Sequence, residues 1–454
     1  MRIADLKAKQ FEIPACHDER GAGRRNSPPK ADPPRRHIER AEKSAIEPVS
    51  PLKQFMQALD KELHVLRNQN LFRTLSTIEE RRGSAARIDG KWLVLWCTND
   101  YLGLSMHPRV VGAACEAARR WGVGARASRL LAGSTQLHEH LEQQLAEFFH
   151  TEAALVYPSG YQANLGTLSA LLSRQDLVLV DRFAHASLID ACRASHATLR
   201  VFRHNDAGHV ANLLGRYAAA RRRLVVTEGV FSMDGDHAPL GELVDVVQRA
   251  GAVLYLDDAH GAFATGASGR GSPEVAGIPH DTMLYMGTLG KALGCQGGFV
   301  VGPRALVEFL RNRARTFIYS TALAVPVVAA AREALRLVHE DPTPRLRLAQ
   351  HVEQFQARLS SLERVHPALS RKSGVHHPIP SHIVPIMVGS ARQACELASQ
   401  LLSRGMFAPA IRPPTVPQGT ARLRISLTAL HTAEQLEQLA AALCELVNDP
   451  SSFH

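Results

Sequence analysis

Short apolar runs that alternate with helix-length stretches constrain the fold of this chain more than any other feature. The runs have the length and composition of buried strands. They lie at residues 153–157, 177–181, 199–202, 224–228, 253–257, 283–286 and 298–301. Strands separated by helical stretches pair mainly in parallel, because a parallel connection needs a crossover that a helix can provide. The sequence therefore predicts the α/β fold class with a mainly parallel sheet.

Polar residues recur in the turns that follow these strands. His185 follows the second run, Ser232 follows the fourth, and Asp257 ends the fifth. Singly, each such residue is more often a helix cap or a turn former than a ligand contact. In open α/β sheets, however, ligands bind at the carboxyl ends of the strands. The recurrence of polar residues at these ends predicts a ligand site along that edge of the sheet.

Lys291 lies in a glycine-rich turn directly after the sixth run. Its amine can form a Schiff base with an aldehyde if its surroundings lower its pKa, because only the neutral amine is a nucleophile. Taken alone, Lys291 is more simply interpreted as a solvated lysine in a surface loop. The fifth run, residues 253–257, changes this interpretation.

That strand ends in Asp257 and Asp258, and His260 follows two residues later. Two carboxylates at the end of a buried strand are unfavourable unless they are paired. A protonated pyridine nitrogen would pair with one of them and lower the carboxylate's pKa. Asp257 could instead cap a helix, and His260 could be an ordinary turn histidine. An acid and a lysine at two such strand ends favour pyridoxal 5'-phosphate (PLP), a cofactor whose ring acts as an electron sink.

Composition excludes some classes of protein. The net charge is +10, but Lys and Arg are spread along the chain, so a basic rim that attracts an anionic substrate is as good an explanation as nucleic-acid binding. The seven cysteines are scattered and form no C-x-x-C pair, which indicates reduced thiols, and we expect no metal site. No membrane-length apolar run and no signal-peptide pattern occurs, so we expect a cytoplasmic protein.

Composition and periodicity divide the chain into four expected segments. These are a disordered basic extension (1–50), an N-terminal helix and strand segment (51–98), a PLP-binding large domain (99–330) and an α+β C-terminal domain (331–454). The first segment is rich in Arg and Pro and has no periodicity. Apolar residues at helical spacing begin near Met56. We expect the functional chain to start near Met56, and a truncation starting at residue 51 that lost activity would contradict this.

Seven motifs together resemble the α-oxoamine synthases, a family of PLP enzymes of fold type I. The resemblance runs from about Met56 to the C-terminus. In chain order, the motifs are Asn99-Asp-Tyr-Leu-Gly103, Ser159-Gly-Tyr161, His185-Ala-Ser-Leu188, Thr227-Glu-Gly-Val-Phe-Ser-Met-Asp-Gly-Asp236, Asp257-Asp-Ala-His-Gly261, Thr288-Leu-Gly-Lys-Ala-Leu-Gly294 and Arg422-Leu-Arg424. The resemblance implies a seven-stranded, mainly parallel large domain with a smaller α+β C-terminal domain. It also implies a homodimer with the site at the subunit interface, where Ser320 and Thr321 would serve the neighbouring subunit.

The resemblance also implies roles for individual residues. Lys291 would hold PLP and remove the Cα proton of the amino acid, Asp257 would pair with the pyridine nitrogen, and His185 would stack on the ring. The other implied cofactor contacts are Gly160, Tyr161, Ser232, His260 and Thr288. The implied substrate contacts are Arg73, His185, Thr415 and Arg424, with Arg424 holding the carboxylate of the amino acid. The residues alone favour a different view of Arg424, because the run 422–428 alternates and would place its arginines in solvent.

The loop 411–424 resembles the biotin-pathway branch of the family. That branch joins L-alanine to a pimeloyl thioester, of CoA or of acyl carrier protein, and releases CO2 and the free carrier. Glycine C-acetyltransferase, 5-aminolevulinate synthase and serine palmitoyltransferase-like activities stay open as alternatives, because one methyl group in a pocket is worth only about 1–3 kcal/mol. A remote alternative is a non-catalytic PLP-fold protein that binds nucleic acid. The presence of Lys291, Asp257 and His185 argues against it.

Overall fold

The computed structural model describes residues 50–365 and 379–448. The chain forms two compact units, Met1–Ala58 and Leu59–His454, and all of the sheets lie in the second. Apart from Ser50, the expected N-terminal extension lies outside the described residues. Within the two described ranges, no helix has both the length and the apolar character needed to cross a membrane.

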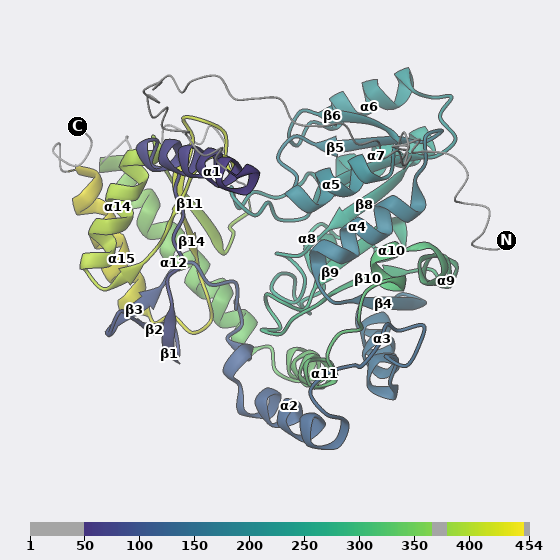
Figure 1. The fold of residues 1–454 in the computed structure, drawn as a ribbon, viewed down its shortest axis with the longest axis horizontal. Coiled ribbons are helices and arrows are strands. Elements are labelled where there is room, and N and C mark those ends of the chain that lie inside the picture. Colours follow the sequence, from purple (N-terminus) through teal and green to yellow (C-terminus); the bar gives the residue numbers. More distant parts are fainter. Residues whose placement is uncertain (1–49, 366–378, 449–454) are drawn as a thin grey trace, which may run out of the picture. The chain divides into compact units, whose positions relative to one another are not determined.

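A seven-stranded sheet organises the larger unit (Figure 1). Its strand order is β4-β10-β9-β8-β7-β5-β6. The strands are β4 (Ala153–Tyr157), β5 (Leu177–Asp181), β6 (Thr198–Phe202), β7 (Arg223–Glu228), β8 (Val253–Asp257), β9 (Leu284–Thr288) and β10 (Gly298–Gly302). β10 is antiparallel to both of its neighbours, and the other neighbouring pairs are parallel. The predicted α/β class with a mainly parallel seven-stranded sheet is confirmed.

Alternate residues of this sheet face two separate hydrophobic cores, because successive side chains on a strand point to opposite faces. Leu177 and Leu179 pack in one core, and Val178 and Val180 pack in the other. The first core includes residues of α3 (Gln136–Phe148), α6 (Ala207–Arg216), α7 (Leu240–Ala250) and α11 (Val325–Glu340). The second includes residues of α4 (Gly160–Leu171), α5 (Ala186–Ala194), α9 (Arg304–Arg313) and α10 (Arg315–Ile318). Burial on both faces explains why the strands are continuous apolar runs in the sequence.

Two smaller sheets complete the unit. The first is antiparallel, in the order β11 (Ile383–Gly389), β14 (Ala421–Ser426), β13 (Ala410–Ile411). The second contains β1 (Ile78–Arg82), β2 (Ala85–Ile88), β3 (Lys91–Leu95) and β12 (Met406–Phe407). β12 pairs in parallel with β3, so a short C-terminal strand extends a sheet that begins near the N-terminus. The expected domain boundaries at residues 98/99 and 330/331 stay a prediction.

The remaining helices of the described chain are α1 (Pro51–Asn68), α2 (Pro108–Trp121), α8 (Ser272–Val275), α12 (Thr343–Val365), α14 (Ala391–Ser403) and α15 (Ala433–Asn448), with single 3-10 turns at Leu104–Met106 and His280–Thr282. Proline at the start of α2 is favourable, because the first turn of a helix needs no amide donor there.

β14 differs from the alternating, half-exposed strand that its sequence predicts. All six of its residues are buried. The Arg422 guanidinium forms an ion pair with Asp234, and Arg424 Nε donates to the backbone oxygen of Ser232. The loop after β7 therefore covers the face that the alternating pattern assigns to solvent.

Candidate active site

The carboxyl ends of three neighbouring strands bring the predicted residues together. Asp257 is the last residue of β8, and Glu228, the last residue of β7, lies opposite it in the parallel register. β9 is the other neighbour of β8, and Lys291 follows its last residue, Thr288, by three positions. Parallel strands end at one edge of a sheet, where ligands bind in folds of this class.

A hydrogen-bonded chain connects Lys291 to the interior. Lys291 Nζ lies 2.7 Å from His260 Nε2, and His260 Nδ1 lies 2.6 Å from the hydroxyl of Tyr101. Burial lowers the pKa of Lys291 to about 8. Burial, with the neighbouring charge of Lys291, also holds the pKa of His260 well below its usual value, so this imidazole is neutral. A lysine with this pKa has a useful neutral fraction at physiological pH and can act as a nucleophile or a base.

Asp257 is a buried carboxylate with a hydrogen bond on each oxygen. Asn164 Nδ2 donates to Oδ2 at 2.7 Å, and the backbone N–H of Ala259 donates to Oδ1 at 3.0 Å. Only 5% of Asp257 is exposed. These bonds fix the plane of the carboxylate, which can pair with a cation presented at the sheet edge.

His185 is the N-cap residue of α5. Its backbone N–H donates to Glu228 Oε1 at 2.6 Å, and the second oxygen of Glu228 accepts from the backbone N–H of Ser232 at 3.3 Å. Glu228 thus ties the loop with His185 to the loop with Ser232. Burial lowers the pKa of His185, the positive charge of Lys291 lowers it further, and Asp257 opposes the shift. The imidazole of His185 is therefore neutral at physiological pH.

His204 makes a second connection between the same two loops. Its Nδ1 lies 2.8 Å from Asp181 at the end of β5, and its Nε2 lies 2.6 Å from Asp236. Burial disfavours a charged imidazole, but hydrogen bonds to the two carboxylates outweigh burial and raise the pKa of His204 to about 10. The imidazolium therefore holds the turn before His185 against the turn after Ser232.

The N-terminus of α4 carries the predicted residues Gly160 and Tyr161. Ser159 caps this helix by accepting a hydrogen bond from Gln162 N at 3.2 Å. Free amide groups and the positive end of the helix dipole make such a terminus an anion site. Gly298 of β10 packs so tightly here that a Cβ on it would lie 2.6 Å from Gly160 Cα. The Tyr161 side chain lies against α5, where its hydroxyl donates to Asp190 at 2.5 Å.

Thr288 ends β9 beside this helix terminus. Its hydroxyl donates to the backbone oxygen of Gly297 at 2.8 Å and accepts from Gly290 N at 3.1 Å. A Cβ placed on Gly160 would be 3.5 Å from that hydroxyl. Thr288 is therefore close enough to contribute to an anion site formed by α4.

Arg424 is buried with 7% of its surface exposed. Its NH1 donates to Asn99 Oδ1 at 3.1 Å and its NH2 donates to the Tyr101 hydroxyl at 3.2 Å. Its other hydrogen bonds are also to neutral oxygens, those of Ser232 and Ser426. Among the described residues it has no carboxylate partner. A buried guanidinium without a counter-ion favours an anionic ligand, because burial of an uncompensated charge is costly.

Arg73 and Thr415 lie together, as expected of two residues of one substrate site. Arg73 NH2 lies 3.1 Å from the backbone oxygen of Pro413 and 3.5 Å from Thr415 Oγ1. Arg412 in turn donates to the backbone oxygen of Phe72 at 3.4 Å. The loop and the segment before β1 thus hold each other. Contact of Arg73 or Thr415 with a substrate stays a prediction.

The donor set fits PLP. The cofactor needs an amine for its aldehyde, a carboxylate for its ring nitrogen and amide donors for its phosphate. Lys291 has a lowered pKa, Asp257 is a buried acid on the adjacent strand, and α4 begins beside the end of β9. These three groups are complementary to the three polar groups of PLP.

Five residues of the site were not predicted as functional. Asn99, Tyr101 and Glu228 lie within three of the seven family motifs, Asn164 lies four residues after Gly160, and His204 lies two residues after the end of β6. For most of them, a position in or near a family motif is the sequence signal that could have identified them as functional. No spacing links Asn164 to Asp257, which is far away in the sequence.

Comparison with known proteins defines the class. The chain belongs to the aminotransferase class I and II family, whose model matches residues 91–443, and within it to the α-oxoamine synthases. The predicted family is thereby confirmed.

Individual relatives of known name narrow the comparison from the family to one kind of enzyme. An 8-amino-7-oxononanoate synthase of Geobacter sulfurreducens is 46% identical over 387 residues, covering 85% of this chain and 96% of the relative. The enzyme of the same name from Anaeromyxobacter dehalogenans is 44% identical over 388 residues, with 86% and 95% covered.

Solved structures share the fold. A serine palmitoyltransferase from S. paucimobilis with a bound PLP–myriocin aldimine has a TM-score of 0.80 at 32% identity, covering 87% of this chain and 98% of that one. An 8-amino-7-oxononanoate synthase from Francisella tularensis has a TM-score of 0.66 at 28% identity, with 78% and 98% covered.

Proposed function

We propose that this chain is a PLP-dependent acyltransferase of biotin biosynthesis. It condenses L-alanine with pimeloyl-CoA, or with the pimeloyl thioester of acyl carrier protein, to give 8-amino-7-oxononanoate, CO2 and the free carrier. Relatives with this activity in their names are 42–46% identical over about six-sevenths of the chain. The observation that carries the proposal is Lys291, an amine with a pKa lowered to about 8 at the carboxyl edge of the sheet.

PLP, when bound, supplies a ring that accepts the electrons left on the amino-acid Cα when its proton leaves. Lys291 Nζ would bind the aldehyde of the cofactor with loss of water. Once the amino group of alanine has displaced it, the freed Nζ would take the Cα proton. Its lowered pKa keeps part of it neutral, which both tasks require. Asp257 pairs with the ring nitrogen and keeps that nitrogen protonated. Its two hydrogen bonds hold the carboxylate in place for this pairing.

The remaining cofactor contacts surround these two groups. The amides of Gly160 and Tyr161 and the hydroxyl of Thr288 bind the phosphate at the N-terminus of α4. Ser232 and His260 would hold the ring hydroxyl of the cofactor. His260 is already 2.7 Å from Lys291 Nζ, which supports a place beside the bond between lysine and cofactor.

Three residues bind the substrates in this proposal. Arg424 binds the carboxylate of alanine, and its buried charge without an acidic partner among the described residues supports this role. Arg73 and Thr415 contact the acyl substrate. His185 helps to position both reactants in one crevice, which lowers the barrier by fixing their mutual geometry.

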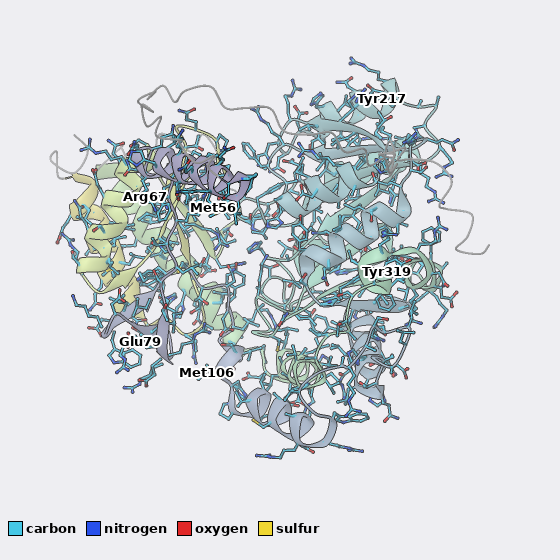
Figure 2. The ribbon with its side chains drawn as sticks, viewed as in Figure 1. Met56, Arg67, Glu79, Met106, Tyr217 and Tyr319 are labelled. Carbon is cyan, nitrogen blue, oxygen red and sulfur yellow. The ribbon has the colours of Figure 1, made fainter. Side chains whose placement is uncertain are left out.

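We also propose that the chain is a homodimer in the cytoplasm, with Ser320 and Thr321 contributing to the partner's site. Tyr319, which precedes them and is labelled in Figure 2, has 72% of its surface exposed. Leu131 and Val123, in the loop after α2, are 81% and 83% exposed. A partner chain over this region would bury these large apolar side chains.

A second candidate is condensation of L-serine with a long-chain acyl-CoA. It is favoured by the serine palmitoyltransferase structures, whose TM-scores reach 0.80 against 0.66 for the synthase from Francisella. The sequence relatives favour the first candidate, since they are 42–46% identical to this chain whereas the serine palmitoyltransferase of known structure is 32% identical.

A substrate panel decides between the two. The PLP-loaded protein is given L-alanine, glycine or L-serine, each with pimeloyl-CoA, acetyl-CoA or palmitoyl-CoA. Released CoA is measured with a thiol reagent, and the product is identified by mass spectrometry. We expect turnover with alanine and pimeloyl-CoA and the mass of 8-amino-7-oxononanoate. Reactions without amino acid control for thioester hydrolysis. Turnover with serine and palmitoyl-CoA alone would support the second candidate, and no amino-acid-dependent release would contradict both.

A further inference from the structure

Asn164 on α4 connects the two predicted ring contacts, Asp257 and His185. Its side-chain nitrogen donates to Asp257 Oδ2 at 2.7 Å and to Ser187 Oγ at 2.9 Å. The Tyr255 hydroxyl donates to its oxygen at 2.8 Å. Asn164 and Ser187 are each 1% exposed, and Tyr255 is fully buried. One amide therefore uses both of its hydrogens and its oxygen inside the protein.

The orientation of this amide follows from its partners. A carboxylate can only accept, so the atom of Asn164 that faces Asp257 must be the nitrogen. The second hydrogen of that nitrogen goes to Ser187 Oγ. Because this oxygen accepts from Asn164, its own hydrogen is free to be donated elsewhere. Its next neighbour is His185 Nδ1, at 2.8 Å.

Ser187 presents two groups to His185 Nδ1. Its backbone N–H, which can only donate, lies 3.2 Å from that nitrogen. Its hydroxyl oxygen lies 2.8 Å away and can donate or accept. A nitrogen that accepts from the backbone N–H cannot carry a proton of its own, so the hydroxyl is the donor in its contact with Nδ1. The proton of the neutral imidazole must then be on Nε2, for which the described residues offer no hydrogen-bond partner.

We propose that Asn164 is a positioning residue that holds the Asp257 carboxylate and, through Ser187, fixes His185 as the tautomer with its proton on Nε2. His185 then offers an N–H donor to an oxygen of the substrate and does not act as a base. Lys291 is left as the group that takes the Cα proton. This catalytic consequence rests on the proposed function, whereas the tautomer does not.

Titratable groups around His185 come from four parts of the fold, and burial raises the pKa of one of them, Glu228, well above its usual value. Asp257 ends β8, Glu228 ends β7, Lys291 follows β9 and Asp190 lies on α5 itself. Asp257 and Asp190 favour the protonated imidazole, while burial and Lys291 disfavour it. The two donors from Ser187 also disfavour the protonated imidazole, because they bind only the unprotonated Nδ1.

Neutron diffraction from crystals of the deuterated protein without PLP tests the tautomer directly. We expect deuterium on His185 Nε2, none on Nδ1, and the Ser187 hydroxyl deuterium aimed at Nδ1. Deuterium on Nδ1 would overturn the inference. Because this readout needs neither cofactor nor turnover, it can succeed even if the proposed substrates are wrong.

Two substitutions separate the effect of Asn164 on His185, which acts through Ser187, from its effect on Asp257. Ser187→Ala removes the hydroxyl donor and should raise the titration midpoint of His185 by about 0.5–1 pH unit, while weakening PLP binding less than Asn164→Ala does. Asn164→Ala should also release Asp257 and weaken PLP binding by about tenfold or more. The midpoint is read by NMR of ring-15N histidine, with His185→Gln to assign the signal.

Ser195→Ala is the matched control. Ser195 lies at the end of the same helix, is buried and donates to Cys192 O, away from His185. It should change neither the midpoint nor PLP binding. If Asn164→Ala does not fold, Ser187→Ala still tests whether the Ser187 hydroxyl controls the protonation of His185. An unchanged midpoint in Ser187→Ala, or unchanged PLP binding in folded Asn164→Ala, would overturn the proposal. A correct tautomer in a protein inactive with every substrate would overturn the proposed function alone.

Discussion

The lowered pKa of Lys291 makes a quantitative prediction about how fast the protein captures PLP. Burial is the main cause of the shift, Asp257 and Glu228 oppose it, and the positive charge of Arg424 adds to it. At pH 7 a pKa of about 8 leaves about one amine in eleven neutral, whereas 10.5 would leave about one in three thousand. The buried amine should therefore react about 300-fold faster at pH 7 than an ordinary lysine of equal intrinsic reactivity.

Stopped-flow absorbance after mixing PLP with protein stripped of cofactor measures this rate. We expect it to rise about tenfold per pH unit up to about pH 8 and then to level off. N-acetyl-lysine, measured in parallel, corrects for the titrations of PLP itself. Arg424→Met should move the break to higher pH, because it removes a repelling charge. A rate that climbs without a break towards pH 10.5, as for the free amine, would refute this account of the site.

Substitutions elsewhere should each change a different quantity. Arg424→Met should raise the KM for alanine about 10- to 100-fold, because it removes a charged hydrogen-bonding partner of the carboxylate. Gly298→Ala should weaken PLP binding, measured by equilibrium dialysis, because its Cβ would be 2.6 Å from the first residue of α4. His204→Gln should lower the free energy of unfolding, measured with urea. Since the pKa of His204 is raised from 6.5 to about 10, this loss should be full below pH 6.5 and should fade as the pH rises to 10.

Matched variants control for general damage. Arg422→Met removes an arginine from the same strand but one that pairs with Asp234, so stability should fall with little effect on the KM for alanine. Gly302→Ala lies on the same strand as Gly298 but meets only a flexible leucine side chain at 3.1 Å, so PLP binding should persist. A difference between wild type and His204→Gln that does not depend on pH would contradict the charge assignment.

The sequence predicted the part of the site that follows from local signals and one rule of topology. Lys291, Asp257 and His185 each follow or end a short apolar run, and runs separated by helices form parallel strands. Because parallel strands end at one edge, residues far apart in the chain can be placed together from their positions in the sequence alone. The antiparallel β10 did not disturb this prediction, since it carries none of the three.

The rest of the site depends on contacts that no local pattern encodes. The alternation around Arg424 is typical of a half-exposed strand, and only the loop after β7, packed across it, buries the arginine. Asn164 on α4 meets Asp257 at the end of β8 although the two residues are 93 positions apart in the chain. The two-residue strand β12 forms only because β3 offers an edge to it. Each of these depends on how distant segments pack.

Borohydride reduction of the PLP-loaded protein, followed by peptide mapping, tests most directly whether Lys291 is the amine that holds the cofactor. Reduction fixes the lysine–cofactor bond, and Lys291 is the only lysine between Lys91 and Lys372, so its peptide is easily distinguished. We predict one reduced cofactor per chain, on the peptide that contains Lys291, and none in Lys291→Ala. Label on another lysine, or a protein that takes up no PLP, would contradict the account.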